Sequence, residues 1–389
     1  MADVVLIHDW LTGMRGGEKC LEVACRRWPT APLRTLLHAP GTVSPIIENR
    51  PILASPLNRL PRVERYYRYL LPILPAVAQR HFRIPQAGLV LSFSHCVAKA
   101  ATAPGQTAHV CYCFTPMRYA WDMRESYFGA ARLGRIQGRA VEWLLARLRD
   151  WDRRTAQNVT HFIAISQTVQ ARIRACYGRD SVVIYPPVDT TFYTPADQHQ
   201  PREDFYLVVS AFAPYKRIDL AIEACNRLKR RLVVIGAGQD GKRLAQLAGP
   251  SVQLLGKQPD AVIRDHYRRC RALLFPGEED FGIVPVEAMA CGAPVIALGR
   301  GGASETVAPL GQSASPAGVW FTEQNAEALI AAIEQFEANA DRFDPLAIRT
   351  PTLRFNPKRF AADLFAFIEA ARRQPLTGPG QPLERPRAA

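Results

Sequence analysis

Two carboxylates, eight positions apart, stand out in the second half of the chain. Glu279 lies in the loop GEEDFG, which follows the apolar run RALLF, and Glu287 lies inside the helix expected next. Such a loop sits at the carboxyl end of a strand, where open α/β sheets bind ligands, and the helix start behind it offers free N–H groups and partial positive charge. The two carboxylates can hold the hydroxyls of a sugar and a ribose. Alternatively, Glu279 only caps the helix and Glu287 is a surface residue.

Two cations stand at the end of another apolar run. A strand is expected to end at about Phe212 and a helix to begin near Ile218, so Lys216 and Arg217 lie on the turn between them. Two cations at the carboxyl end of a strand suit a diphosphate. The alternative is loop charge exposed to solvent. A third small-residue turn, GGASETV (301–307), enters a helix and is a weak signal alone.

A dinucleotide-binding motif is also present in literal form. VVIGAGQDG (233–241) places Gly236, Gly238 and Gly241 after an apolar run, a spacing typical of nicotinamide or flavin dehydrogenases. The acidic residue that should follow about 20 positions later is unconvincing. SVQLLG is followed by KQP before Asp260.

The elements that position these residues alternate between strand and helix. Two series of apolar runs are expected to be strands: 4–8, 88–94, 109–114, 160–166 and 181–187, then 205–212, 230–236, 251–256, 271–277, 293–298 and 318–321. Helices are expected over 139–156, 167–177, 217–229, 240–247, 259–269, 284–291, 303–308 and 325–338. In the helix after the GEEDFG loop, Pro285 suits the first position and Gly292 the C-terminal stop. The alternation predicts an α/β chain with two doubly wound parallel sheets.

The proline-rich segment 186–201 separates the two series and is typical of an interdomain connection. We therefore expect an N-terminal Rossmann-like domain over 1–187, a linker over 188–201 and a C-terminal Rossmann-like domain over 202–355. Residues 374–389 are rich in proline, glycine and charge, which predicts a disordered tail.

Composition restricts the class of protein. Of the 389 residues 48% are hydrophobic, and the nine cysteines are scattered without a CxxC pair. Zinc ribbons and dithiol redox motifs therefore lack their spacing, and we expect buried free thiols. No run of about 18 apolar residues predicts a spanning helix, and the N-terminus lacks the basic region of a secretory signal. These features indicate a cytoplasmic protein.

The charge is strongly basic, with a formal net charge of +14. Such a surface attracts phosphates of nucleic acids, anionic lipids or small molecules. Arginines interleave with leucines and aromatic residues in segments 59–83 and 132–154. A basic amphipathic segment can lie on an anionic membrane surface, and the alternative is a helix with an arginine-rich solvent face.

Glu279 and Glu287 match the E-x7-E motif of retaining glycosyltransferases of the GT-B fold, glycosyltransferase family 4. The resemblance spans roughly residues 4–370 and looks closest to members that add mannose or a related sugar during bacterial polysaccharide assembly. It is carried in order by HDWLTGMRGGEKCLE (8–22), SHCVAKAA (94–101), TPMRYAWDM (115–123), IAISQTVQARI (163–173), VVIYPPVDTTFY (182–193), PYKRIDLAIEA (214–224), FPGEEDFGIVPVEAMACGAPVIA (275–297) and GGASETV.

The resemblance implies two Rossmann-like domains that face each other across a cleft, with the donor site in the C-terminal domain. Glu279 would meet the donor sugar, Lys216 would hold the diphosphate and Glu287 would bind the ribose. Arg217 and Asp280 belong to the same donor site. Backbone N–H groups would face sugar and phosphate at Phe281, Gly282 and Ile283.

The acceptor site is implied in the N-terminal domain. Gly16 and Gly17 would let a loop approach the donor phosphates and the acceptor, and the acceptor side includes Asp9, His95 and Arg118. The final helix, about 356–373, would cross back onto this domain.

Two positions depart from the family pattern. Family members commonly carry an arginine just after the strand that precedes the lysine, where this chain has Ala211. Many also carry histidine before Thr-Pro, where this chain has Phe114. A phosphate-binding cation and a hydrogen bond near the reacting sugar are therefore missing from these positions, unless Arg217 substitutes for the cation.

The resemblance implies a retaining, metal-independent transferase with no cofactor beyond a nucleotide sugar as co-substrate. GDP-mannose is the favoured donor and a UDP-sugar the alternative; the acceptor is a saccharide, lipid-linked in similar enzymes. Other classes left open are a catalytically silent nucleotide-sugar-binding protein, a GT-B epimerase or phosphorylase, a dehydrogenase and a nucleic-acid-binding protein. The last lacks a helix-turn-helix, RRM or OB pattern.

Overall fold

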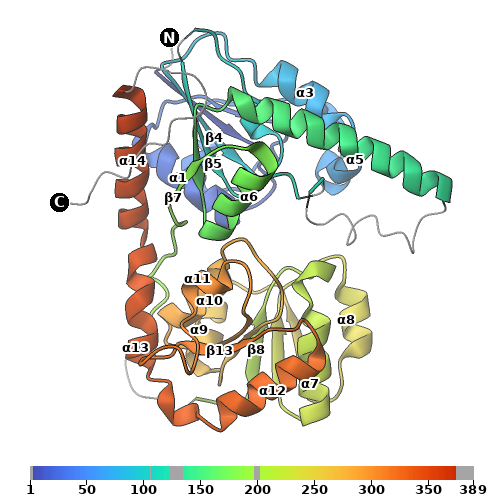
Figure 1. Cartoon of the computed structure of the whole chain (residues 1–389), viewed down its shortest axis with the longest axis vertical. Helices are drawn as coiled ribbons and strands as arrows, with labels where there is room; N and C mark the ends of the chain where they lie inside the picture. The colour runs from blue at the N-terminus through green and yellow to red at the C-terminus, as the bar shows by residue number, and fades with distance from the viewer. Residues whose placement is uncertain (1–2, 106, 119, 122–134, 197–201, 374–389) are drawn as a thin grey trace. The chain divides into compact units, whose positions relative to one another are not determined.

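The computed structural model describes residues 3–105, 107–118, 120–121, 135–196 and 202–373. The chain divides into two compact units: unit 1 combines Met1–Pro187 with Lys358–Ala389, and unit 2 is Val188–Pro357. Each unit holds one parallel sheet between helices (Figure 1), so the expected pair of Rossmann-like α/β domains is confirmed. The expected tail over 374–389, part of the expected linker (197–201) and the first residues of segment 132–154 lie outside the described residues.

Unit 1 contains a seven-stranded sheet in the order β3-β2-β1-β4-β5-β6-β7. Its order reverses between β1 and β4, which pair in parallel from Val4 opposite Leu89 to His8 opposite Phe93. The carboxyl ends of these two strands form the switch point of unit 1, where open α/β sheets bind ligands. The strands are β1 (Val4–His8), β2 (Leu33–Thr35), β3 (Ile52–Ala54), β4 (Leu89–Ser94), β5 (Ala108–Cys113), β6 (His161–Ala164) and β7 (Ser181–Val183).

Helices cover both faces of this sheet (Figure 1). On one face α1 (Gly16–Arg27) lies beside α14 (Pro357–Arg373), where the rings of Trp28 and Phe365 are 5.4 Å apart. On the other face α3 (Leu74–His81) and α5 (Arg135–Thr155) join a buried apolar cluster. The shorter helices are α2 (Pro45–Glu48) and α6 (Gln167–Tyr177).

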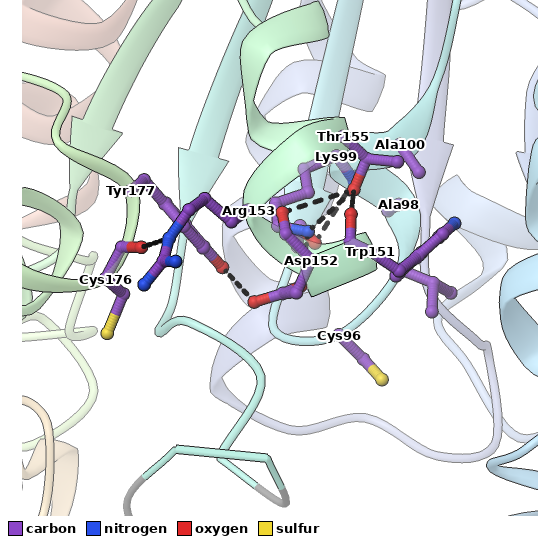
Figure 2. A network of polar contacts seen from close by, with 12 residues as sticks. Cys96, Ala98, Lys99, Ala100, Trp151, Asp152, Arg153, Thr155, Cys176 and Tyr177 are labelled. Atoms are coloured by element: carbon purple, nitrogen blue, oxygen red, sulfur yellow. Dashed lines mark hydrogen bonds and ion pairs between the residues drawn. The ribbon is translucent and has the colours of Figure 1, made fainter. Parts of the chain in front are cut away.

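A buried ion pair fixes α5 to the core of unit 1 (Figure 2). The Lys99 ammonium donates to Asp152 Oδ1 at 2.5 Å, and both side chains are almost fully buried. Tyr177 OH and Trp121 Nε1 donate to Oδ2 of the same carboxylate at 2.8 and 2.9 Å. Because removing one partner of a buried pair costs roughly 3–5 kcal/mol, this cluster holds Trp121 firmly against α5.

Unit 2 contains a six-stranded sheet in the order β10-β9-β8-β11-β12-β13. Its order reverses between β8 and β11, which pair in parallel with Leu207 opposite Leu273. Helices α7, α8 and α12 lie on one face and α9, α10 and α11 on the other (Figure 1). The elements are β8 (Tyr206–Val209), α7 (Ile218–Leu228), β9 (Leu232–Ile235), α8 (Gly241–Leu247), β10 (Val252–Gly256), α9 (Asp260–Arg269), β11 (Leu273–Phe275), α10 (Ile283–Ala290), β12 (Val295–Leu298), α11 (Ala303–Thr306), β13 (Gly318–Phe321), α12 (Ala326–Glu337) and α13 (Pro345–Arg349).

Three expectations need correction. Segment 59–83 is not one amphipathic helix: short 3-10 turns precede α3, whose second residue is Pro75. Pro285 occupies the third position of α10 rather than the first. Strands β2 and β3, three residues each, were not expected from the sequence, because runs this short show no period.

The nine cysteines are buried free thiols, as expected. Within the described residues, no helix is both long enough and apolar enough to cross a membrane.

Candidate functional site

The switch point of unit 2 brings together the two strongest sequence signals. Lys216 follows β8 on a 3-10 turn (Pro214–Lys216), and Glu279 follows the neighbouring strand β11. Their side chains form an ion pair, with only 13% and 21% of the side chains exposed. Because β8 and β11 are adjacent parallel strands, residues after their carboxyl ends meet at one edge of the sheet.

Gly277 makes this approach possible. A Cβ atom at position 277 would lie 2.9 Å from Cα of Lys216 and 3.0 Å from its carbonyl oxygen. Any side chain there would separate the two loops. The glycine between β11 and Glu279 therefore places the carboxylate beside the cation.

Helix α10 begins directly behind the ion pair. Its N-cap is Gly282, whose φ of 80° lies in the left-handed region that favours glycine. The ring of Phe281 packs edge-to-face on Phe355 at 5.3 Å, so Phe281 can offer a ligand only its backbone. The first N–H groups of a helix lack intrahelical partners, which makes the start at Ile283 suitable for phosphate or hydroxyl oxygens.

The GGASETV turn supports this loop from the other side. Gly302 N–H donates to the carbonyl of Glu279 at 2.8 Å. A Cβ atom at Gly301 would lie 2.3 Å from that carbonyl oxygen, and one at Gly302 would lie 2.2 Å from Cα of Phe281. The two glycines therefore position the site loop by close backbone packing.

Glu287 is buried inside α10 and is 6% exposed, so the alternative that it is a surface residue is wrong. Tyr267 OH of α9 donates to Glu287 Oε2 at 3.4 Å. Burial raises the pKa of the Tyr193 and Tyr267 phenols, and the Glu287 carboxylate raises both further. The phenols therefore stay protonated and can act as hydrogen-bond donors to the Glu287 side chain.

Arg217 lies close to this site but its charge is shared. Its Nε donates to Asp219 Oδ1 at 3.2 Å, and Nη1 donates to the carbonyl of Gln324 at 3.4 Å. Gln324 in turn donates to the carbonyl of Pro276 at 2.9 Å, at the end of β11. The guanidinium therefore braces the site loop, and the exposed Ala211 offers no second cation.

The glycines of the GxGxxG loop pack against another segment of the chain, the loop after β8. A Cβ atom at Gly236 would lie 1.8 Å from the carbonyl oxygen of Ser210, and one at Gly238 would lie 2.4 Å from that of Phe212. Phe212 N–H donates to the Ala237 carbonyl at 2.9 Å. These glycines therefore admit the loop after β8, which weakens the dehydrogenase interpretation.

At the switch point of unit 1, Asp9 is occupied by the backbone. Its carboxylate is fully buried and accepts the N–H groups of residues 95–98 at 2.6–3.0 Å. Oδ2 also lies 3.0 Å from Nδ1 of His95. Burial alone would raise the pKa of Asp9, but the charge of His95 and its hydrogen bonds outweigh burial and lower the pKa to about 2. Asp9 therefore holds the loop after β4 and has no exposed surface for an acceptor.

The other residues expected on the acceptor side differ in their exposure and in their neighbours. His95 is partly exposed and its ring centroid lies 6.3 Å from those of His8 and Phe114. Gly16 and Gly17 start α1, with Gly17 against the Phe114 ring. Arg118 is partly buried, in the segment that follows β5. Sequence reasoning missed His8, although the strand-ending HD pair marks it.

A cavity of about 450 Å³ opens at the carboxyl edge of the unit 1 sheet, beside the segments that follow β1, β2 and β3. His38, Asn58, Thr12 and Arg62 are among its polar lining residues. Arg62 has a φ of 53°, a left-handed conformation that is uncommon for a side chain of this size. The cavity can hold a polar ligand, and no local motif marked it in the sequence.

Known proteins match part of the chain in sequence and nearly all of it in fold. Residues 189–347 match the family model "Glycosyl transferases group 1". An uncharacterized glycosyltransferase of Methanocaldococcus jannaschii is 30% identical over 156 residues, 39% of this chain and 43% of that protein. A D-inositol 3-phosphate glycosyltransferase of Gordonia bronchialis is 30% identical over 188 residues, 40% of this chain and 41% of that protein. The matched region thus spans about two fifths of these relatives.

Two solved structures match nearly the whole chain at 17% identity. HepE from Anabaena, in complex with UDP and glucose, has a TM-score of 0.66 and covers 95% of this chain and 100% of its own. Sucrose-phosphate synthase from Thermosynechococcus elongatus has a TM-score of 0.69 and covers 95% and 99%. At this identity the likeness shows the fold. Residues 189–347 are therefore similar to the group 1 glycosyl transferases, within a chain that has the two-domain GT-B fold.

Proposed function

We propose that the chain is a retaining glycosyltransferase that moves a sugar from a nucleotide sugar to a saccharide acceptor. The observation that carries the proposal is the Lys216–Glu279 ion pair at the switch point of unit 2, in front of the start of α10. A cation, a carboxylate and free helix N–H groups at one edge match a leaving diphosphate and the sugar attached to it.

The charges explain how the reaction would be accelerated. As the nucleoside diphosphate leaves, negative charge grows on its phosphate oxygens while the sugar becomes oxocarbenium-like. The Lys216 ammonium and the start of α10 stabilise that charge more in the transition state than in the ground state. Glu279 would then face the sugar, and the acceptor hydroxyl would attack on the face that the diphosphate leaves. Protein cations perform the task that a metal ion performs in other transferases.

Two nucleotide sugars are candidate donors, and they differ in their base. The sequence resemblance favours GDP-mannose, whereas the solved HepE structures contain UDP and UDP-glucose, which favours a UDP-sugar. In either case Glu287, held by Tyr267, would bind the ribose. The acceptor would bind along the carboxyl edge of the unit 1 sheet, where the 450 Å³ cavity lies. A lipid-linked saccharide acceptor would make this a step in cell-surface polysaccharide synthesis.

The test is the release of nucleoside diphosphate from GDP-mannose and UDP-glucose in the presence of EDTA. We expect release from one donor, with the freed or transferred sugar keeping its anomeric configuration by NMR. Inverted configuration, or activity that requires an added divalent metal, would contradict the proposal. Binding of a donor without turnover would identify the catalytically silent alternative.

Contact with an anionic membrane is a second part of the proposal. Tyr69 is 86% exposed, and Trp143, 60% exposed, stacks under the guanidinium of Arg147 at 4.2 Å. Exposed arginines surround Tyr69 in sequence at positions 59, 62, 65, 80 and 83. Aromatic rings and arginines of this kind favour the interface of an anionic bilayer, here the inner face of the cell membrane.

Sedimentation with vesicles tests this contact. We expect binding to vesicles that contain phosphatidylglycerol, with loss at high salt and on Tyr69→Ser, and none to pure phosphatidylcholine. Equal binding to both vesicle types would contradict an electrostatic contact.

A further inference from the structure

His8 is a buried imidazole with one ring nitrogen that has no partner. It ends β1 at the switch point of unit 1 and is 1% exposed. Nδ1 donates to the carbonyl of Trp10 at 2.9 Å, whereas Nε2 has no hydrogen-bond partner among the described residues. A buried polar atom without a hydrogen bond costs about 1–3 kcal/mol. The unsatisfied nitrogen therefore points to a ligand.

Nε2 faces the start of α1. A Cβ atom at Gly17 would lie 3.4 Å from Nε2 and 3.2 Å from two ring carbons of Phe114. Because Gly17 has no such atom, the first turn of α1 packs closely against both rings, and Nε2 lies beside the backbone of Gly17. A hydroxyl oxygen that hydrogen-bonds to Nε2 at about 3 Å would therefore lie next to this turn.

Helix α1 supplies the complementary donors. Gly16 and Gly17 are the first two residues of this 12-residue helix. The N–H groups in the first turn of a helix have no intrahelical partners. An oxygen bound to the acceptor Nε2 would therefore lie close to the backbone donors of this turn.

The proton on Nδ1 decides which ligand fits. Burial lowers the pKa of His8; Glu18 and Asp9 raise it, and His95 lowers it further. The ring is therefore neutral at pH 7, with Nε2 as an acceptor. A diphosphate has no proton to donate to Nε2, whereas a hydroxyl group can donate to Nε2 and accept from a helix N–H group.

We propose that His8 binds a sugar hydroxyl on unit 1: the hydroxyl donates to Nε2 and accepts from the N–H of Gly16 or Gly17. The inference rests on the proposed function, since the ligand is the saccharide acceptor. It adds His8 to the expectation that these glycines approach the donor phosphates and the acceptor. His8 becomes a specificity-determining residue that requires a hydroxyl at one ring position of the acceptor.

The first experiment reads the nitrogen directly. The full chain is labelled with 15N-histidine and titrated with methyl α-mannoside, methyl α-glucoside and, separately, inorganic phosphate. We expect the unprotonated Nε2 resonance of His8 to shift with at least one glycoside and to stay unchanged with phosphate. Protonation of Nε2 by bound phosphate, or no response to either glycoside, would overturn the inference.

The second experiment uses a matched pair of variants. His8→Phe and His8→Gln both lose the hydrogen bond to Trp10, but only glutamine keeps an acceptor near the position of Nε2. We expect His8→Phe to weaken glycoside binding about tenfold, and His8→Gln to remain within about threefold of the wild type, by saturation-transfer NMR. Thermal melting checks that both variants fold, and equal loss in both would overturn the inference.

Calorimetry with nucleotide sugars distinguishes failure of the proposed function from failure of the His8 inference. If the wild-type protein binds no nucleotide sugar by calorimetry, the proposed function fails. If it binds a nucleotide sugar while His8 responds to neither glycoside, the function stands and the His8 inference alone fails.

Discussion

The two switch points of this chain share a topology and differ in their charges. In unit 2, Lys216 and Glu279 pair at the carboxyl ends of β8 and β11 and remain partly exposed. In unit 1, Asp9 at the end of β1 is fully buried, and its oxygens accept four backbone N–H groups of the loop after β4. The same edge of the same kind of sheet thus carries a partly exposed ion pair in one unit and a buried structural carboxylate in the other.

The hydrogen-bonding partners of a carboxylate decide whether a ligand can displace them. The Glu279 carboxylate faces one flexible ammonium, which a diphosphate can attract in its place. The Asp9 carboxylate is fixed by main-chain donors that no ligand can replace without opening the loop. Beside Asp9, the groups that we propose bind a ligand are the neutral imidazole of His8 and the start of α1. The proposed pair of a charged donor site and a neutral hydroxyl site is the division expected of a sugar transferase.

The largest expected effect is on catalysis at unit 2. Lys216→Ala removes a cation aimed at the leaving phosphate, so we expect kcat to fall about 10²–10³-fold, or about 2.7–4 kcal/mol. Lys242→Ala, on the exposed face of α8, is the control and should leave kcat unchanged. Steady-state kinetics with the preferred donor measure both, and a loss below threefold would remove Lys216 from the mechanism.

The next effect is on the stability of unit 1. Asp9→Asn replaces an oxygen acceptor by an amide that faces N–H donors, so we expect a loss of roughly 3 kcal/mol in the free energy of unfolding by urea. Asp150→Asn, exposed on α5, is the control. If Asp9→Asn has the stability of the wild type but loses sugar-transfer activity, Asp9 contacts substrate. That result would contradict the structural role that distinguishes it from Glu279.

Asp9 also predicts a pH dependence. Its folded pKa of about 2 lies below its ordinary value of 3.8, so the folded state is favoured while the carboxylate is charged. This contribution, about 2 kcal/mol, is complete above about pH 4 and is lost as the pH falls towards 2. Acid unfolding of Asp9→Asn should lack this part of the transition, and an unchanged acid profile would contradict the pKa shift.

A smaller effect is expected at the ribose. Glu287→Gln keeps the volume and one acceptor but loses the charge, so we expect roughly tenfold weaker binding of the nucleotide sugar. Calorimetry measures it, with Glu334→Gln on the exposed face of α12 as the control. Unchanged affinity for the nucleotide would show that Glu287 is structural, held between tyrosines for packing alone.

The smallest effect on stability is expected for Gly17→Ala, which tests ligand recognition with little change in folding. Gly17→Ala improves helix propensity by about 0.5–1 kcal/mol but crowds Phe114, so we expect little net change in melting temperature. The new methyl group would lie 3.4 Å from Nε2 of His8 and crowd an oxygen bound there, so glycoside binding should be lost. A variant that binds glycosides normally would place the acceptor elsewhere, such as in the cavity near Arg62.

The sequence predicted the fold better than the roles of single side chains. Runs such as VVLIH and PVIAL identify buried strands, and their order with helices fixes the parallel sheets, so Lys216 and Glu279 could be expected at one edge. The GxGxxG glycines could not be interpreted from spacing, because only the structure shows the loop of Ser210–Phe212 against them. The burial of Asp9 could not be predicted from the sequence either, because its backbone partners lie 86 to 89 positions away.

His8 shows a further limit. The residue type and its place at the end of β1 are visible in the sequence, but the engaged Nδ1 and the unpaired Nε2 depend on Trp10 and Gly17 being in place. Three-residue strands such as β2 also escape detection, since so few residues carry no periodicity.

The most direct measurement of the central claim is calorimetry with a panel of nucleotides and nucleotide sugars, NAD included, without added metal. We expect saturable binding of one nucleotide sugar, weakened at least tenfold by Lys216→Ala and unaffected by Lys242→Ala. Binding of NAD alone, or nucleotide-sugar binding that Lys216→Ala leaves intact, would contradict it.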